Sequence, residues 1–399
     1  MVFYRQVGTV PAQRHTQLRG PDGRLRYEEL MGEEGFSSDS SLLYHRHVPS
    51  AIVGSEPWQL PDQALTPNHP LKPRHLRLPT LAFAPDACPV QDRRLLLGNA
   101  DVRIGYVVTE STSPLYRNAI GDECVFVQSG RGTVETVLGV LDYRPGDYVI
   151  LPRATTHRWV PAERSELYCI EANSHLAPPK RYLSRFGQLL EHAPYCERDL
   201  TPPRDLEALV DGVEGERDVP VRVKHRVRGL PGQIGGTTLT SQQHPFDVVG
   251  WDGCLYPYTL NIDDYMPITG KVHQPPPVHQ VFEGHNFVIC NFLPRKVDYH
   301  PLSVPVPYYH SNVDSDEVMF YVAGDYEARK GSGIGIGSIS LHPGGLPHGP
   351  QPSAIEASLG AERFEETAVM VDTFAPLELG AGAAESEDPG YAWSWANDA

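Results

Sequence analysis

The sequence has few cysteines, and none of them stands close enough to another to suggest a zinc motif. Its 399 residues include six cysteines without a C-x-x-C pair, which excludes a zinc ribbon and a dense disulfide framework. We therefore expect reduced thiols. The six positions are Cys88, Cys124, Cys169, Cys196, Cys254 and Cys290.

Long apolar runs and an excess of basic residues are also missing. No run of about 18 apolar residues occurs, and the first ten residues lack the apolar centre of a signal peptide. There are 34 basic against 50 acidic residues, so the formal net charge is −16. This charge disfavours nucleic acids and anionic membranes as partners. We expect a soluble, cytoplasmic protein that acts on a small molecule.

Glycine and proline, in contrast, are abundant, with 36 and 38 residues. They cut the chain into short segments, which suits many short strands better than long helices. Runs such as C-V-F-V-Q-S-G-R-G-T-V-E-T combine period-two alternation with a tight turn, which is a hairpin pattern. The length also favours two domains. The sequence thus predicts an all-β or β-rich fold with a few short helices.

Composition divides the chain into five segments. They are an N-terminal wrapping segment with a proline-rich connector (1–79), a first β-domain (80–196), a connecting region (197–244), a second β-domain (245–380) and a mobile acidic tail (381–399). Tyr182, Phe186, Leu189 and Leu190 have helical spacing, which predicts one amphipathic helix over 178–192.

One pattern of spacings occurs twice, and it is the most informative feature of the sequence. In each half a glutamate precedes a glycine by seven residues, a second glycine precedes a proline by six, and a histidine follows five later. The positions are Glu123, Gly130, Gly146, Pro152 and His157 in the first half, and Glu317, Gly324, Gly337, Pro343 and His348 in the second. This resembles the paired motif of the cupin fold and implies a bicupin of two jelly-roll β-barrels.

The second half also carries a complete set of candidate metal ligands. His310, Glu317 and His348 offer two imidazoles and one carboxylate, a set that suits iron(II) with open coordination positions. Asp316 competes formally with Glu317, but only Glu317 keeps the seven-residue spacing. In the first half Tyr116 and Asn118 precede Glu123 where a histidine ligand is needed. We therefore expect one degenerate barrel and one metal-binding barrel.

Other polar residues are candidates for substrate and supporting roles. His273 or His279 is a candidate general base, because an imidazole titrates near working pH; the alternative is that one or both only pack beneath the proline-rich bend. Tyr326 is a candidate hydrogen-bond donor to a substrate oxygen, unless it only fills the barrel wall. His342 and Asn312 are expected to support the metal ligands.

Four motifs together resemble the homogentisate 1,2-dioxygenase family across most of the chain. They are L-R-Y-E-E-L-M-G-E-E-G-F near the start, P-F-D-V-V-G-W-D-G at 245–253, Y-Y-H-S-N at 308–312 and S-L-H-P-G-G-L-P-H-G-P at 340–350. The resemblance implies an iron(II) enzyme that cleaves homogentisate with dioxygen to maleylacetoacetate in tyrosine and phenylalanine breakdown. It implies His310, Glu317 and His348 as ligands, Tyr326 as a substrate contact and His273 as the base. It also implies a homotrimer or hexamer.

Two departures from the family pattern bear on the substrate. One extra residue lies between His310 and Glu317, and Ser311 stands where better-known members have arginine. Loss of that cation weakens recognition of an acetate side chain, so another hydroquinone or a gentisate-like acid is the alternative substrate. A non-catalytic bicupin that binds a small molecule is the third hypothesis.

Overall fold

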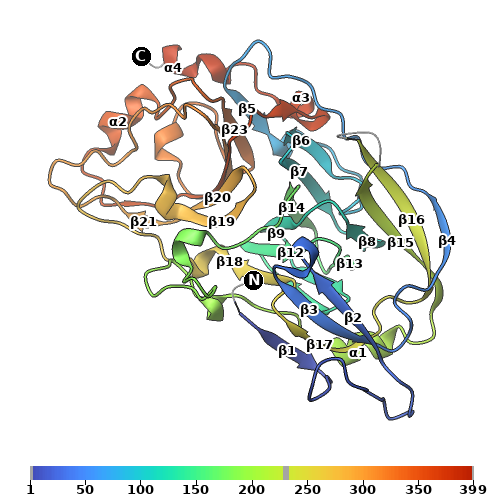
Figure 1. Ribbon diagram of the computed structural model, residues 1–399. Helices are drawn as coiled ribbons and strands as arrows, with labels where there is room; N and C mark the ends of the chain where they lie inside the picture. Colours follow the sequence, from blue (N-terminus) through green and yellow to red (C-terminus); the bar gives the residue numbers. More distant parts are fainter. Residues whose placement is uncertain (1–2, 228–232, 398–399) are drawn as a thin grey trace. The chain divides into compact units, whose positions relative to one another are not determined.

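Two compact units make up the computed structural model, which describes residues 3–227 and 233–397. The N-terminal unit comprises Met1–Pro61, Phe83–Arg93 and Val107–Asn261. The C-terminal unit comprises Asp62–Ala82, Arg94–Tyr106 and Ile262–Ala399. Both consist mainly of antiparallel strands (Figure 1). The all-β prediction is therefore confirmed.

The strands of the N-terminal unit form three groups. One sheet has the order β11 (Gly139–Tyr143), β10 (Gly132–Thr136), β13 (His157–Pro161), β8 (Leu115–Asn118), β15 (Arg217–Arg226), β16 (Ile234–Gln243) and β4 (Ile52–Pro57). A second group has the order β18 (Tyr258–Asn261), β12 (Asp147–Leu151), β9 (Glu123–Ser129) and β14 (Ser165–Ala172). The third is a sheet of β1 (Arg5–Gly8), β17 (Val248–Gly253), β3 (Ser40–His45) and β2 (Tyr27–Gly32).

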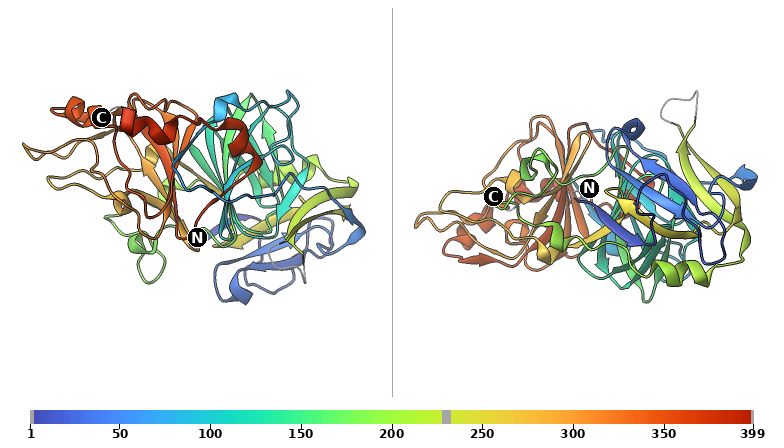
Figure 2. Two further views of the ribbon diagram at one scale, coloured as in Figure 1. Left: turned by 90° about the horizontal axis from the view of Figure 1, so that it is seen from above. Right: turned by 60° about the horizontal axis from the view of Figure 1, so that its bottom comes forward.

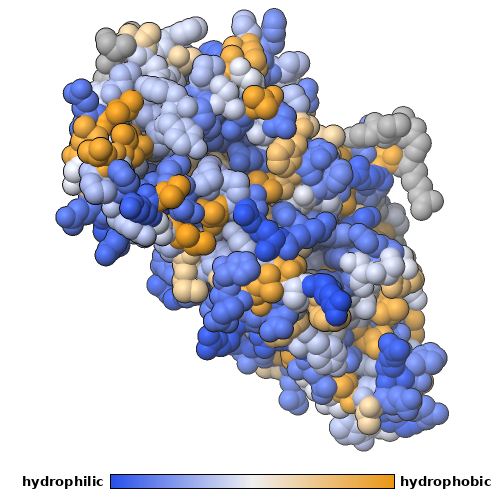
Figure 3. All heavy atoms as spheres, turned by 60° about the vertical axis from the view of Figure 1, so that its left-hand side comes forward, coloured by the Kyte–Doolittle hydropathy of each residue, from blue (hydrophilic) through white to orange (hydrophobic). Residues whose placement is uncertain are grey.

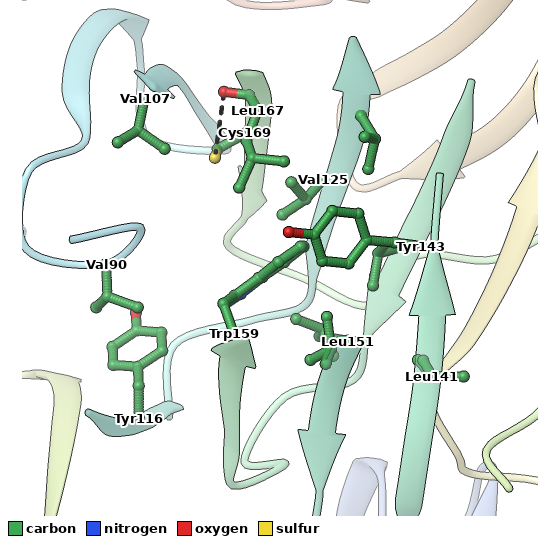
Figure 4. Close-up of a cluster of buried hydrophobic side chains, with 13 residues drawn as sticks. Val90, Val107, Tyr116, Val125, Leu141, Tyr143, Leu151, Trp159, Leu167 and Cys169 are labelled. Carbon is green, nitrogen blue, oxygen red and sulfur yellow. Dashed lines mark hydrogen bonds between the residues drawn. The ribbon is translucent and has the colours of Figure 1, made fainter. Parts of the chain in front are cut away.

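One apolar core joins the first two groups of strands (Figure 4). Alternate residues point into it, such as Val125 and Val127 from β9, while Trp159 enters from β13 and is fully buried. Because successive side chains of a strand face opposite sides, this alternation places every second residue in the core. The hairpin expected over residues 124–136 is wrong, because β9 pairs with β12 and β14 whereas β10 pairs with β11 and β13 in the other sheet.

The C-terminal unit is built around one six-stranded sheet. Its order is β19 (Gln280–Gly284), β20 (Phe287–Phe292), β25 (Thr367–Thr373), β22 (Asp316–Ala323), β23 (Ser338–His342) and β5 (Arg74–Arg77). Smaller pairings join β21 (Arg295–Lys296) to β24 (Arg363–Phe364) and β6 (Arg94–Gly98) to β26 (Glu378–Leu379). The unit boundary falls within β7 (Val102–Thr109). Figure 2 shows the orange and red strands as one group with the last helices outside them.

Helices are short. The α-helices are α1 (Leu206–Gly212), α2 (Pro352–Ser358), α3 (Ala381–Ser386) and α4 (Ser394–Asn397). Single 3₁₀ turns lie at Glu34–Phe36, Leu78–Thr80, Lys180–Tyr182, Glu197–Asp199, Ile262–Asp264, Pro276–His279, Glu327–Arg329 and Tyr391–Trp393. In the described part of the chain, no helix is both long enough and apolar enough to cross a membrane.

The repeated glycines have a structural reason. Gly130 and Gly324 both adopt positive φ angles, of 89° and 88°, a region that L side chains rarely enter. A Cβ atom would also lie 2.5 Å from a backbone oxygen at Gly130 and 1.7 Å at Gly324. Both units therefore need glycine in the turn that follows the strand carrying the repeated glutamate, β9 in one unit and β22 in the other.

The expected helix over 178–192 is wrong. Only the turn Lys180–Tyr182 is helical, and Phe186, placed on the predicted apolar face, is 82% exposed. Gly187 has a φ of 84°, and the Ser184 hydroxyl accepts hydrogen bonds from the backbone N–H groups of residues 186 and 188. A serine that bonds nearby backbone in this way competes with helical hydrogen bonding.

The five expected segments also need correction. Residues 74–77, assigned to the N-terminal wrapping segment, form β5 beside β23 (Figure 1). The tail, which was expected to be mobile, contains the helices α3 and α4 and is described up to Asn397. Its Tyr391 is buried, with 1% of its surface exposed. Both differences arise from strand pairing and burial between residues far apart in the sequence.

A buried charge cluster occupies the first-half counterpart of the metal site. The guanidinium Nη1 of Arg93 donates to Glu123 and to Glu171, each at 2.9 Å, and Asn118 donates to the other Glu123 oxygen at 2.9 Å. Lys224 also contacts Glu171. Arg93 and Glu123 are 9% and 1% exposed. Here an internal cation neutralises the glutamate, which accounts for the missing histidine ligand.

Replacement of Arg93 by methionine is expected to destabilise the protein strongly. It leaves Glu123 and Glu171 without their shared cation, and breaking a buried ion pair from one side costs about 3–5 kcal/mol. The matched control is Arg94→Met, because Arg94 is 45% exposed and lies 3.7 Å from Glu385; its loss costs less than about 1 kcal/mol. Urea unfolding followed by tryptophan fluorescence measures both, and equal losses would contradict the prediction.

Candidate metal centre

Two histidines face each other across a short antiparallel pairing. The backbone N–H of His310 donates to His348 O, and that of His348 donates to His310 O, each at 2.9 Å. Glu317 lies on β22, and ligand atoms of all three side chains lie within 4.8 Å of one another. Local backbone pairing therefore fixes the two imidazoles before any ligand binds.

The ring nitrogens are oriented for metal binding. Nδ1 of His310 bonds to Tyr308 O and Nδ1 of His348 to Leu346 O, both at 3.2 Å. Their Nε2 atoms point to one Glu317 oxygen, at 3.5 and 3.4 Å. Nε2 of His348 is buried and has no regular hydrogen-bond partner in the described chain. With Nδ1 as the donor, Nε2 carries the lone pair that a metal requires, so the three residues fit a divalent cation.

Glu317 is ionised although it is buried. Burial alone raises its pKa, but the nearby imidazoles of His310, His342 and His348 hold the pKa well below its usual value. His342 lies 2.9 Å from the second Glu317 oxygen and 3.0 Å from the Tyr391 hydroxyl. Burial lowers the pKa of His342 to about 3, against the effect of Glu317. A neutral His342 therefore donates from Nδ1 to Glu317 and accepts from Tyr391.

Asp316 has a different function from Glu317. One of its oxygens accepts from the backbone N–H of Gly344 at 2.7 Å and the other from that of Leu377 at 2.8 Å. Both carboxylate oxygens of Asp316 thus bind backbone N–H groups of two other segments of the chain, so neither is left to bind a metal. Glu317, the next residue on the strand, points to the opposite side, as the alternation of a β-strand requires.

His310 and Glu317 line a cavity of about 440 Å³, within the usual size of small-molecule sites, and Gly349 and Pro350, which follow His348, line it as well. Its lining includes His273, His279, Tyr326, Asn312, Ser311, His310 and Glu317. The segment 297–315 supplies part of the wall, and on its outer side Leu302 and Val313 are 86% and 82% exposed. Figure 3 shows apolar patches between polar ones on one face of the molecule.

The two candidate bases have different surroundings. Nδ1 of His273 lies 3.0 Å from the Asp298 carboxylate, and its side chain is 36% exposed. His279 is 3% exposed and packs against Phe292, with the ring centres 4.9 Å apart. Burial, together with Arg295 and His273, lowers the pKa of His279 to about 3. His273 thus has the carboxylate partner that orients a catalytic imidazole, whereas His279 is a buried neutral ring.

Tyr326 and Asn312 also lie at the cavity. Tyr326 is 8% exposed, and its buried hydroxyl has no hydrogen-bond partner among the described residues. A buried hydroxyl without a partner is costly, so a ligand oxygen in the cavity would satisfy it. Asn312 contributes its backbone oxygen to a 2.7 Å hydrogen bond from Gly345.

Two residues at the cavity were missed from the sequence. Asp372 on β25 pairs with Glu317 across the sheet, and burial, followed by Glu317, raises its pKa to about 8. Arg329 is 9% exposed and lines the cavity. Asp372 becomes a candidate only once the register of β22 and β25 is known. Arg329 could have been found from the sequence, because it follows the candidate Tyr326 by only three residues.

A second group of potential ligands lies in the N-terminal unit but carries its own positive charge. His175 Nδ1 lies 3.0 Å from Glu33 and 3.5 Å from Asp122. Hydrogen bonds with Asp122 and Glu33 raise the pKa of His175 to about 10. The imidazole is therefore protonated at neutral pH, and a proton takes the place that a metal would need.

Comparisons with known proteins show the family of the chain. Residues 97–262 match the family description "Homogentisate 1,2-dioxygenase N-terminal", and residues 261–397 match "Homogentisate 1,2-dioxygenase C-terminal". A Saccharolobus solfataricus protein, provisionally named as a dioxygenase, is 38% identical over 99% of both chains. Homogentisate 1,2-dioxygenase of Pseudomonas syringae is 31% identical over 67% of this chain and 61% of its own length. A solved "Cupin 2 conserved barrel domain protein" from Leptotrichia buccalis covers 79% of this chain and 100% of its own, with 10% identity and a TM-score of 0.34.

The class that these observations define is a protein of two β-rich units, one of which carries a His-Glu-His group suited to hold a metal ion, as the sequence predicts. The chain belongs to the homogentisate 1,2-dioxygenase family. The family prediction is therefore confirmed, and with it membership of a family of oxidoreductases.

Loss of one ligand is expected to abolish tight metal binding. Wild-type protein should bind one divalent cation per chain, and His348→Ala should bind less than a tenth as much at the same free metal concentration. His342→Ala should weaken binding about 10–100-fold, the usual effect of removing a group that orients a ligand. Equilibrium dialysis with metal analysis measures all three. The control is His300→Ala, an exposed histidine outside the cavity; undiminished binding by His348→Ala would reject the site.

Proposed function

We propose that the protein is an iron(II)-dependent ring-cleaving dioxygenase that converts homogentisate and dioxygen to maleylacetoacetate, in tyrosine and phenylalanine catabolism. The observation that carries this proposal is the convergence of His310, Glu317 and His348 beside a cavity that His310 and Glu317 line. Family membership supports the reaction class.

The ligand set supports iron as the metal. Two imidazoles and one carboxylate are the set found in iron(II) oxygenases, and they leave coordination positions open. When bound, iron(II) supplies the redox chemistry that lets dioxygen react with the aromatic ring. The chain itself contributes a fixed ligand geometry, because Glu317 is held by His342 and both histidines by backbone carbonyls.

His273 is the base that the surroundings favour. Asp298 bonds to its Nδ1, which leaves Nε2 to accept a phenolic proton from the substrate. The same carboxylate stabilises the imidazolium that forms, as in other carboxylate–histidine pairs. His279 has no such partner and resists protonation because it is buried.

Tyr326 and the cavity walls position the ring. The unsatisfied Tyr326 hydroxyl can donate to a substrate oxygen, and Phe292, Phe364 and Met319 provide apolar surface around it. Holding the ring against the metal site turns a reaction between separate molecules into an intramolecular one.

The second candidate is the same chemistry on gentisate or a plain hydroquinone. Ser311 is exposed and lines the cavity next to the ligand His310, so this position supplies no cation for an acetate side chain.

Oxygen uptake is expected with the iron-loaded protein and homogentisate. Gentisate and hydroquinone, tested at equal concentration, identify the substrate, and absorption and mass of the ring-opened product confirm that both oxygen atoms are incorporated. His348→Ala should lower the rate at least a thousandfold, while His300→Ala should keep it. Absence of uptake with homogentisate, together with uptake on another ring, would transfer the proposal to that substrate.

Replacement of the two candidate bases is expected to have unequal effects. His273→Gln should lower kcat about 10²–10⁴-fold, because a positioned general base contributes about that much. The loss should be smaller at alkaline pH, where the phenol ionises without help. His279→Gln should lower kcat less than tenfold and reduce thermal stability instead. Reversed effects in a pH–rate series would assign the base to His279.

A further inference from the structure

Arg329 is a buried cation on the inner wall of the cavity. It ends the turn Glu327–Arg329 after β22 and is 9% exposed. Its Nη1 donates to the backbone oxygen of Gly349, and its Nε donates to the Tyr321 hydroxyl at 3.3 Å. The Trp395 ring lies 5.6 Å from the guanidinium carbon. The guanidinium is thus held firmly by neutral groups.

Arg329 lacks a carboxylate within ion-pair distance in the described chain, which distinguishes it from comparable arginines. Arg93, equally buried, contacts two glutamates at 2.9 Å, and Arg295, on the same cavity wall, contacts Glu366 at 2.9 Å. A buried charge without a counter-ion is strongly unfavourable. The position of Arg329 therefore calls for an anion in the cavity.

Three other acidic residues at the cavity have ion-pair partners, and Asp372 lies beside Glu317 on the neighbouring strand. Glu317 contacts His310, His342 and His348, and Asp298 contacts His273. Glu366 is paired with Arg295. None of these carboxylates is left over for Arg329, so the cavity can accept one more negative charge at this wall.

Arg329 is also close to the reacting end of the cavity. It bonds to the carbonyl of Gly349, the residue after the ligand His348. When an acid side chain is attached beside a ring hydroxyl, the carboxylate stays near that hydroxyl. A cation that recognises it must then lie near the metal ligands, as Arg329 does, whereas the neighbouring Ser311 is uncharged.

We infer that Arg329 binds the carboxylate of the substrate and selects dihydroxyaromatic acids over neutral dihydroxyarenes. This inference rests on the proposed ring-cleaving function and deepens it, because it names the group that decides between an acid and a plain hydroquinone. A guanidinium is suited to the role since its planar donors match the two oxygens of a carboxylate.

Binding of two unreactive phenols to the metal-loaded full-length protein, under nitrogen, tests the inference without turnover. The pair is 2-hydroxyphenylacetate and 2-ethylphenol, which share the ring hydroxyl and differ in the carboxylate. Calorimetry on the wild type should show the acid binding at least tenfold more tightly, as expected for a charge-assisted hydrogen bond. Equal affinities would overturn the inference.

Variants assign the preference to Arg329. In Arg329→Met the acid should lose at least tenfold in affinity while 2-ethylphenol keeps its own. Arg329→Lys should lose severalfold, because a lysine cannot form the paired contact. The control is Lys296→Met, which removes a positive charge from the exposed edge of the same cavity and should preserve the preference.

The outcomes separate the inference from the function on which it rests. A wild-type preference that persists in folded Arg329→Met overturns the role of Arg329. If that variant does not fold, an unchanged preference in Arg329→Lys overturns it instead. Absence of oxygen uptake by the wild type with any dihydroxyarene rejects the proposed function, whatever the binding results.

Discussion

The contacts of the buried Glu317 carboxylate with three imidazoles are the interaction on which the candidate metal centre of the C-terminal unit depends. The carboxylate stays ionised only because three imidazoles surround it, and each imidazole is positioned by something else. Backbone carbonyls orient His310 and His348, while the Tyr391 hydroxyl completes the hydrogen bonding of His342. The C-terminal tail that contains Tyr391 is thereby part of the metal centre rather than an appendage.

The two units show two ways to neutralise a glutamate at the same place in the repeat. In the N-terminal unit Glu123 bonds to Arg93 and Asn118, so the protein supplies the cation from its own chain. In the C-terminal unit Glu317 faces two histidines whose Nε2 atoms suit an external cation. The same repeated motif thus forms a buried ion pair in one unit and a candidate metal site in the other.

Charge is distributed around the cavity so that most groups are satisfied within the chain. His273 has Asp298 and Arg295 has Glu366, whereas the Tyr326 hydroxyl and the charge of Arg329 have no such partner in the described residues. A bound ligand could satisfy both groups. The proposed selectivity rests on such incompletely satisfied groups, since a satisfied group gains little from a substrate.

Much of the site was predictable from the sequence alone. The repeated spacing identified Glu317 and His348 and separated Glu317 from Asp316, because strand alternation and glycine turns follow short-range rules that spacing records. His310 was found as the second imidazole nearby in the sequence. Tertiary structure alone decided what depends on pairing between distant residues: the pairing of β5 with β23, the burial of Tyr391, the partners of Arg93 and the place of Asp372 beside Glu317. The failed helix over 178–192 has the same origin, since local apolar spacing cannot show which hydrogen bonds the folded chain makes instead.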